Sequence, residues 1–442
     1  MSEARPHSDR YWDARETWPR EKLAAHQLER LKAQLAYVHD NSHFYRQRHE
    51  RLGWNPGDLK TLDDLRALPV TRKANYVDAV NDAPPWGTQL AAPLDSVVRV
   101  HFSSGTTAKP APDCWTQKDL HRWSDLYARM AYSQGVRKSD VFQCLFSLSW
   151  FVGGLGGMGS YTKIGALCIP AGSVDSERQV RTIFDYGTTA VCATPSFAVH
   201  LIEVARGMDL DLRDSKVARI ALGGEPGASI PATRALIEHG WNAKAYDAYG
   251  SLEFQPIAWE CAEKAGSHLA EDFALAEILD PATEQPVPDG TPGVLVLTHL
   301  DKEACPLIRW WTGDVVVRDP SPCACGRTHA RLAGGVRGRA DDMLIVRGVN
   351  VFPSAVEEVV RATPGTTGEY LIVLDKDVSD HAGFLTGIKL RVERAPDAPP
   401  NLTVRLTDAL RAALQVRAVV EVVEPGVLPR TTHKAKRILR EI

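Results

Sequence analysis

The sequence lacks the features that would suit the protein to a membrane or to nucleic acid. No apolar run in its 442 residues reaches the ~18 residues that a membrane-spanning helix requires. The first ten residues, MSEARPHSDR, lack the apolar stretch of a signal peptide. Positive charge is not in excess either, because 52 Lys and Arg face 55 Asp and Glu, for a net charge of -3. We therefore expect neither membrane nor nucleic acid as a partner, and predict small-molecule ligands.

The composition also lacks the biases of fibrous, disordered or disulfide-stapled chains. Hydrophobic residues make up 44% and charged residues 24%, and no internal repeat is present. Of the eight cysteines, four stand singly in apolar surroundings, as reduced core residues do: Cys114, Cys144, Cys168 and Cys192. We therefore expect a globular protein of the reducing cytoplasm.

Segments of helix and strand type alternate over most of the chain. Residues 21–50 have the apolar spacing of a helix, and residues 116–134 have a second such pattern, in which Thr116 can cap and Asp119 stands three residues on. Strand patterns occupy residues 97–102, 166–170, 189–192 and 217–222. This alternation predicts an α/β fold made of a large N-terminal region with several subdomains.

The C-terminal part of the sequence has a different order of elements. A strand at 343–349 is followed by a helix at 353–362, two strands, a helix at 402–413, a strand and a final basic loop. That order predicts a small α+β domain of ferredoxin-like type. The glycine-rich, charged stretch GVRGRADD precedes it, so we predict a large domain over 1–338 and a small mobile domain over 339–442, joined by a hinge.

A loop rich in hydroxyl groups and glycine follows the strand at 97–102. Its sequence, SSGTTAKP at 103–110, places hydroxyls, backbone amides and one lysine in a single turn, which suits a polyphosphate. The Gly105 to Lys109 spacing is too short for a Walker A motif. Taken alone, the loop could equally be a Ser/Thr-rich surface turn.

Five further motifs follow the loop in order along the chain. They are GGEP at 223–226, YDAYGSLE at 246–253, TGD at 312–314 with GRADD at 338–342, and LPRTTHK at 428–434. In these motifs and their order the chain resembles the adenylate-forming superfamily, and within it the phenylacetate-CoA ligases and related aryl-CoA ligases. The likeness covers nearly the whole chain.

The resemblance implies a set of ATP-binding residues that combines the Ser/Thr loop with the later motifs. The set is Ser103, Ser104, Gly105, Thr106, Thr107, Lys109, Gly224, Glu225, Pro226, Asp247, Tyr249, Gly250, Asp314 and Arg339. By the same resemblance Tyr249 stacks on adenine, Asp247 accepts from its amino group, and Asp314 binds the ribose hydroxyls. Glu253 holds Mg²⁺, whose charge offsets the repulsion between a carboxylate and the α-phosphate.

The catalytic residues implied by the resemblance are Lys434, Glu253 and Arg339. An ammonium at Lys434 would bridge the carboxylate and the α-phosphate where charge builds up in the transition state. Without the other motifs, the cations near the C-terminus would be taken for a solvated basic tail. In the family the small domain then turns about a hinge, which Asp341 matches, and presents residues 347–353 for transfer to CoA.

The acyl pocket is expected around the sequence FSLSWFVGG. Aromatic walls with a glycine floor suit a flat ring, and the residues we assign to them are Phe146, Trp150, Phe151 and Gly154. The same residues could form an ordinary core segment with a tight turn. An aromatic acid as substrate is therefore implied mainly by the resemblance.

Three cysteines and a histidine suggest a structural zinc site. Six residues lie between Cys261 and His268, and Cys323 and Cys325 form a C-x-C turn. Folding could bring these soft ligands into a closed tetrahedral Zn²⁺ shell, and some aryl-CoA ligases have similar spacings. Cys305, which precedes a proline, is the rival ligand, and four unrelated reduced side chains are the other interpretation.

Two positions depart from the family pattern and keep other functions open. Ala108 stands in the phosphate loop, and His433 precedes the key lysine, where glycine is usual in both places. Ordinary drift explains such changes, and so does a different acid or acceptor. One alternative is an ATP-dependent diazotase that adenylates nitrite for an aryl amine, and another is a nucleotide-binding pseudoenzyme. The oligomeric state is open, with a homodimer among the candidates.

Overall fold

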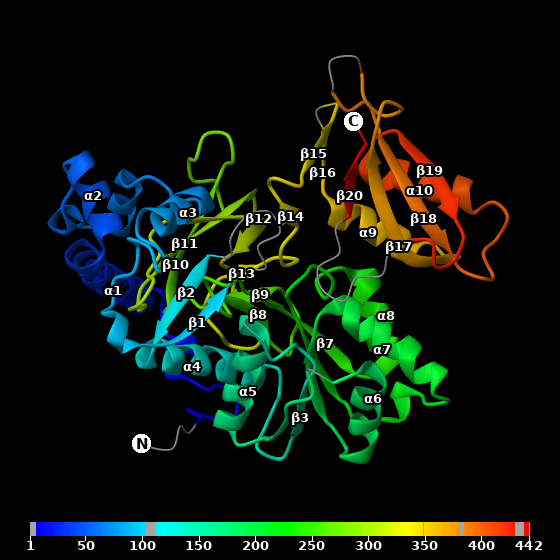
Figure 1. Ribbon diagram of the computed structural model, residues 1–442, viewed down its shortest axis with the longest axis horizontal. Coiled ribbons are helices and arrows are strands. Elements are labelled where there is room, and N and C mark those ends of the chain that lie inside the picture. The colour runs from blue at the N-terminus through cyan, green and yellow to red at the C-terminus, as the bar shows by residue number, and fades with distance from the viewer. Residues whose placement is uncertain are drawn as a thin grey trace.

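The structure is a computed structural model, and it describes residues 6–102, 111–149, 151–172, 174–347, 349–380, 384–428 and 437–441. It has a large N-terminal domain of mixed α/β type and a small C-terminal domain (Figure 1). The expected fold class is confirmed.

The α-helices in the described residues are α1 (Arg20–Asn41), α2 (His43–Leu52), α3 (Lys73–Asp82), α4 (Gln117–Ser133), α5 (Val152–Ile164), α6 (Ser176–Asp185), α7 (Pro195–Gly207), α8 (Pro231–Trp241), α9 (Pro353–Ala362) and α10 (Leu402–Leu414). Short 3₁₀ helices lie at Ala14–Thr17, Pro56–Asp58, Leu62–Ala67, Leu94–Ser96 and Leu212–Asp214.

The strands of the large domain are β1 (Val97–Phe102), β2 (Pro112–Thr116), β3 (Val141–Cys144), β4 (Leu167–Ile169), β5 (Ala190–Ala193), β6 (Arg219–Leu222), β7 (Lys244–Tyr249), β8 (Ala258–Glu260), β9 (Ser267–Leu269), β10 (Ala274–Leu279), β11 (Pro292–His299), β12 (Trp310–Asp319), β13 (Arg331–Leu332) and β14 (Gly338–Arg339). Those that follow are β15 (Leu344–Val346), β16 (Val349–Val351), β17 (Thr366–Leu374), β18 (Ile388–Arg394), β19 (Ala418–Val423) and β20 (Ile438–Arg440).

A parallel sheet in the order β4-β3-β5-β6-β7 forms one half of the large domain. Successive residues of a strand point to opposite faces, and the core follows this alternation. On one face, Val191 of β5 and Ile220 of β6 pack against α6, α7 and α8. On the other face, Cys192 and Ala221 of the same strands pack with α4 and α5. Both faces are therefore covered by helices, as a parallel sheet requires.

The other half continues the same sheet with mainly antiparallel strands. Beyond β7 the order is β8, β9, β13, β12, β11 and β10, and β14 pairs with β12. Apolar side chains of these strands form a core with α4. The result is one twisted sheet whose parallel strands end close to the turn between β7 and β8 (Figure 1).

Local sequence signals account for most helix boundaries, with one exception. Thr116 Oγ1 accepts from Asp119 N at 3.2 Å and the Asp119 carboxylate accepts from Thr116 N at 3.0 Å, which confirms the predicted start of α4. The prediction of a single helix over 21–50 is wrong, because two helices, α1 and α2, occupy this stretch. The chain breaks at Ser42, which is extended and whose hydroxyl accepts from Tyr45 N at 3.5 Å to begin α2.

The small domain has its own core around a four-stranded sheet in the order β19-β18-β17-β20. The predicted helices and the strands of 366–374, 388–394 and 418–423 are present. The first predicted strand instead forms a separate hairpin, β15 with β16, and β20 takes the remaining edge of the sheet beside β17. The basic C-terminal segment therefore ends in a strand, where only a loop was expected.

In the part of the chain that the structure describes, no helix combines the length and the apolar character needed to cross a membrane.

Helix α5 approaches α4 closely through Gly156, which generates a stability prediction. A Cβ atom at Gly156 would lie 2.5 Å from Tyr127 Cε2 and 2.8 Å from Trp123 Cζ2. Gly156→Ala should therefore lower the free energy of unfolding by about 1–3 kcal/mol, measured by urea denaturation. The matched control is Gly159→Ala in the same helix, where the nearest atom is Ser124 Oγ at 3.3 Å. This control should be neutral or stabilising by up to about 1 kcal/mol, and equal losses in both variants would contradict the packing argument.

Candidate active site

The candidate site lies where neighbouring parallel strands end at one edge of the sheet. Leu222 at the end of β6 pairs with Asp247 of β7, and β5 ends beside them at Ala193. The turn after β6 approaches β7 closely, because a Cβ at Gly223 would lie 2.7 Å from the carbonyl oxygen of Ala248. Loops at the carboxyl edge of such a sheet form a crevice suited to a ligand.

The predicted nucleotide turn Gly224 to Pro226 extends from this edge. Gly224 has a φ of +87°, and a Cβ there would lie 3.6 Å from Thr194 and 3.9 Å from the ring of Phe146. The Glu225 carboxylate accepts from Ser196 N, in the first turn of α7, at 2.7 Å. Burial raises the pKa of Glu225, and this hydrogen bond opposes the shift. The turn is therefore held between the ends of β5 and β6.

Asp247 is a buried carboxylate beside a second acidic group. Its backbone N donates to Glu260 Oε2 at 2.8 Å, and Ser267 Oγ donates to its Oδ2 at 3.3 Å. Burial, followed by repulsion from Glu260, raises the pKa of Asp247 to about 7, although Arg234 opposes the shift. Asp247 thus titrates near neutral pH, as groups in binding sites often do.

Tyr249, Asp314, Arg339 and Asp341 form a connected polar chain. Tyr249 Oη donates to Asp314 Oδ2 at 2.5 Å, and an Arg339 nitrogen lies 3.5 Å from Asp314 Oδ1. The same guanidinium reaches both oxygens of Asp341, at 2.8 and 3.2 Å. Strand pairing sets this geometry, because Asp314 of β12 lies opposite Arg339 of β14. The chain brings together four of the residues singled out in the sequence.

Glu253 lies in the turn between β7 and β8 that Gly250 begins. A Cβ at Gly250 would lie 3.0 Å from Phe254 O, so the turn is tight at this point. Glu253 is half-buried, and its charge helps to raise the pKa of the buried Asp113 on β2, after the larger effect of burial. One partly exposed carboxylate supplies the kind of oxygen ligand that Mg²⁺ accepts alongside water and phosphate.

The expected acyl segment lies beside the nucleotide turn. The ring of Phe146 lies next to Gly224, and a Cβ atom at Gly153 would lie 3.5 Å from the same ring. Gly154 is buried, and a Cβ there would lie 2.4 Å from Ser147 O. Phe151 is half-buried at the start of α5. Phe146 and Gly154 are thus placed near this edge, and Trp150 lies outside the described residues.

Two predicted parts of the site lie outside the described residues. They are the Ser/Thr loop, Ser103 to Lys109 with Ala108, and the segment that carries His433 and Lys434. The strands that flank the loop pair antiparallel, with Phe102 of β1 opposite Pro112 of β2.

The four predicted metal ligands are gathered in one buried group. Their ligand atoms all lie within 4.8 Å of one another, with Cys261 Sγ 3.9 Å from Cys323 Sγ and Cys325 Sγ 3.4 Å from His268 Nε2. These separations suit a tetrahedral Zn²⁺ with bonds of about 2.0–2.3 Å. His268 Nδ1 faces the carbonyl of His329 at 3.2 Å, which leaves Nε2 for a metal.

The rival ligand Cys305 belongs to a different part of the core. It is buried with Cys114, Ala92 and Ala304, in a cluster separate from that of Cys261, Cys323 and Cys325. The geometry therefore favours the set with His268 over any set with Cys305.

Further residues of the site escaped the sequence analysis. Glu260 and Ser196 contact Asp247 and Glu225, and Thr312 Oγ1 accepts from Asp314 N at 3.0 Å. The acidic character of Glu260 in an otherwise apolar strand, AWE, was a usable signal. Ser196 acts on Glu225 through both its backbone amide and its hydroxyl, and a serine after Thr-Pro carries no signal of this role in the sequence.

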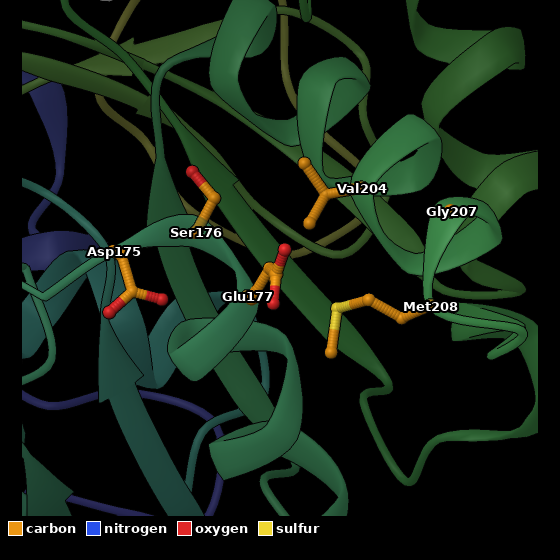
Figure 2. A pocket seen from close by; sticks show the side chains of 6 residues that line it. All are labelled: Asp175, Ser176, Glu177, Val204, Gly207 and Met208. Atoms are coloured by element: carbon orange, nitrogen blue, oxygen red, sulfur yellow. The ribbon is translucent and has the colours of Figure 1, made fainter.

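One surface hollow of the described residues lies apart from the predicted site. This hollow has a volume of about 570 Å³ and is lined by Asp175, Ser176, Glu177, Val204, Gly207 and Met208 (Figure 2). It lies between α6 and α7 and contains none of the predicted site residues.

Comparisons with known proteins agree with this arrangement. The family model described as AMP-binding enzyme matches residues 16–299, and that of the AMP-binding enzyme C-terminal domain matches residues 348–441. Phenylacetate-coenzyme A ligase of Thermus thermophilus is 39% identical over 86% of this chain and 83% of that protein. The Escherichia coli enzyme of the same name is 32% identical over 96% of each chain.

Solved structures of a 2-hydroxyisobutyryl-CoA ligase, 30% identical, match almost the whole chain. Its postadenylation state with 2-HIB-AMP gives a TM-score of 0.92, covering 99% of this chain and 94% of that one. Its thioesterification state with 2-HIB-AMP and CoA gives 0.75, covering 99% and 93%.

The fold and the grouping of motifs at one sheet edge define an adenylate-forming ligase. Family models cover both domains, and close relatives extend over most of the chain. The chain belongs to the AMP-binding enzyme family and is an AMP-forming ligase.

The raised pKa of Asp247 generates a pH prediction. If its carboxylate accepts from the adenine amino group, adenosine should bind the ionised form, so affinity should fall as pH drops through about 7. Between pH 8 and pH 6 the loss should be about tenfold, because the ionised fraction changes by that factor. Adenosine has no phosphate that titrates in this range, and its binding can be followed by calorimetry.

The matched control is Asp247→Asn, which removes the titrating group and keeps an acceptor oxygen. Its adenosine affinity should not vary between pH 6 and pH 8. A wild-type profile retained in this variant would assign the titration to another group.

Proposed function

We propose that this ligase activates an aromatic carboxylic acid as an acyl-AMP, with release of pyrophosphate, and then transfers the acyl group to CoA. The observation that carries the proposal is the ring of Phe146 next to the nucleotide turn at Gly224. An acid with its ring at Phe146 would direct its carboxylate toward that turn. The names of the most similar curated relatives, phenylacetate-coenzyme A ligases, support an aromatic acid and CoA as substrates.

We propose the nucleotide-binding roles that the family resemblance implies, and contacts among the described side chains support part of them. Asp314 would accept from the ribose hydroxyls, with Tyr249 and Arg339 fixing the orientation of its carboxylate. The ring of Tyr249 would stack on adenine, and Asp247 would accept from the adenine amino group. Glu253 would hold Mg²⁺, which supplies charge neutralisation between the acid and the triphosphate when bound. The Ser103 to Lys109 loop would contact the phosphates.

Lys434 is proposed as the catalytic cation of the first step. The acid carboxylate attacks the α-phosphorus, a bond to pyrophosphate breaks, and negative charge accumulates on the atoms between them. A positioned ammonium is most stabilising at that stage, because a desolvated site strengthens its attraction. Lysine suits this role as a compact point charge.

We propose a domain boundary near Gly338 and a hinge at Asp341. Arg339 supports this placement, since it joins Asp341 to the nucleotide-binding Asp314. Gly338 also packs tightly, because a Cβ there would lie 2.5 Å from the ring of Phe352. Rotation about this point would carry the small domain and Lys434 away from the acyl-AMP.

We also propose that Cys261, His268, Cys323 and Cys325 bind a structural Zn²⁺. The four side chains are buried and leave no position for substrate, so the ion would stabilise the fold and take no part in catalysis. A cytoplasmic location is in keeping with eight cysteines that are all free thiols. The homodimer stays a prediction for sedimentation analysis.

The function is tested by AMP and pyrophosphate release over a panel of acids, with and without CoA. We expect release with phenylacetate or another aryl acid, and an aryl-CoA product when CoA is present. Lys434→Ala should lower pyrophosphate release by on the order of a thousandfold. The matched control, Lys436→Ala, removes a neighbouring cation of the same segment and should retain most activity.

The same panel includes nitrite with an aryl amine. Release that requires nitrite would replace the acid–CoA ligase with a diazotase. Inertness of pure protein with every acid would favour a nucleotide-binding pseudoenzyme. Full pyrophosphate release by Lys434→Ala would refute the role given to this lysine.

The zinc site is tested by metal analysis of the purified protein. We expect about one Zn²⁺ per chain, lost together with several kcal/mol of stability in Cys325→Ser, because structural zinc contributes directly to folding free energy. Cys305→Ser is the control, and it should retain the metal. Absence of zinc from the wild type, or its retention in Cys325→Ser, would overturn the assignment.

A further inference from the structure

Helix α8 of the large domain lacks an N-terminal cap of its own. Its N-cap residue is Ile230, which makes no side-chain cap hydrogen bond, and no acidic residue lies in its first turn. The first amides of a helix have no partners within the helix, and the helix dipole favours a negative charge there. The free amides in the first turn of α8 must therefore find a hydrogen-bond acceptor outside this helix.

Two adjacent acidic residues of the small domain meet this need. Glu358 Oε2 accepts from Ala232 N at 3.1 Å, and Thr233 Oγ1 donates to Glu357 Oε1 at 3.4 Å. Both acceptors lie on α9, and both donors lie in the first turn of α8 (Figure 1). The cap of a large-domain helix is therefore supplied across the domain interface.

The acidic pair is held in place and lies close to the nucleotide turn. Arg361 Nε donates to Glu357 Oε1 at 2.8 Å, and both side chains are largely buried. After the larger effect of burial, the charge of Glu357 also raises the pKa of Glu225 in the nucleotide turn, and the charge of Arg437 in the small domain lowers it. The contact thus connects the orientation of the small domain with the site of adenylation.

The orientation that contains this contact matches one of several states seen in a related enzyme. The chain matches the postadenylation state of the 2-hydroxyisobutyryl-CoA ligase with a TM-score of 0.92 and its thioesterification state with 0.75. The two related structures therefore differ in overall arrangement, and this chain has the arrangement of the first.

We propose that Glu358, supported by Glu357, caps α8 only in the adenylate-forming orientation and so serves as a positioning residue for the first half-reaction. This inference rests on the proposed function. Glu358 does not touch the reacting groups, and it acts by holding the small domain in the orientation that serves adenylation. Transfer of the acyl group to CoA does not depend on it.

The test compares the two half-reactions in Glu358→Ala and Glu358→Gln. Adenylation is measured as phenylacetate-dependent exchange of pyrophosphate into ATP, and transfer as formation of phenylacetyl-CoA from supplied phenylacetyl-AMP. Exchange should fall about three- to tenfold in Glu358→Ala, the effect expected for a lost helix cap. Glu358→Gln should fall less, because its amide oxygen still accepts. Transfer should be unchanged or faster in both variants.

The matched control is Glu421→Ala, which removes an exposed acidic residue of β19 that pairs with Arg391 within the small domain. It should leave both half-reactions unchanged. An equal loss of exchange and transfer in Glu358→Ala, or no loss of exchange, would overturn the proposal.

A second measurement does not depend on the acid. Fluorophores on Leu236→Cys of α8 and Val404→Cys of α10, both exposed positions, report the distance between the domains. Cys168→Ser serves as the background, because the other seven native cysteines are buried. The energy-transfer distribution should shift in Glu358→Ala and not in Glu421→Ala.

This second measurement separates the two proposals. A shift without exchange activity on any acid would support the positioning role and refute the proposed function. Exchange in the wild type with no shift in Glu358→Ala would refute the positioning role alone.

Discussion

The ion pairs of Arg339 are the interaction on which the arrangement of the site depends. One guanidinium lies between Asp314, the proposed ribose ligand, and Asp341, the proposed hinge residue. Without this cation, two carboxylates would repel each other at the junction, and Tyr249 would lose a fixed partner for its hydroxyl. Because Arg339 is partly exposed, its pairs are screened and individually weak, so the junction can rearrange.

The charge of the buried carboxylate Asp247 is offset in a different way. Asp247 and Glu260 lie together in the core, and the cation that offsets them is Arg234, which contacts Glu260 at 2.7 Å, while the Ser267 hydroxyl donates to Asp247 at 3.3 Å. The energetic cost of burying two carboxylates appears as the raised pKa of Asp247. In the proposed roles this contrast suits function, because an acceptor for the adenine amino group can be rigid, whereas an ion pair at the proposed hinge would exchange partners.

Sequence patterns predicted those parts of the fold that short-range chemistry determines. The capping box at Thr116 and Asp119 marked the start of α4, and strand-type runs located β1, β5 and β6 to within a few residues. The break at Ser42 was missed, because the apolar spacing continues through it. The edge strand β20 and the packing of Cys305 beside Cys114 were missed, because both depend on contacts between segments distant in sequence. The predicted zinc ligands could be named from their chemistry alone. Cys305 could be excluded as a ligand only from the fold, which places it in a different cluster.

The contact between α8 and α9 has a strength suited to an enzyme with two consecutive reactions. In the proposed mechanism each orientation of the small domain is populated in turn, so the free-energy difference between them can be only a few kcal/mol. A single cap contributes about 1 kcal/mol, which changes the populations several-fold and still allows escape. A buried ion pair at the same place would hold the first orientation far more firmly, because separating it leaves uncompensated charge. Acceptance of backbone and hydroxyl donors by Glu358 and Glu357 avoids that penalty, since water can replace these partners when the domains part.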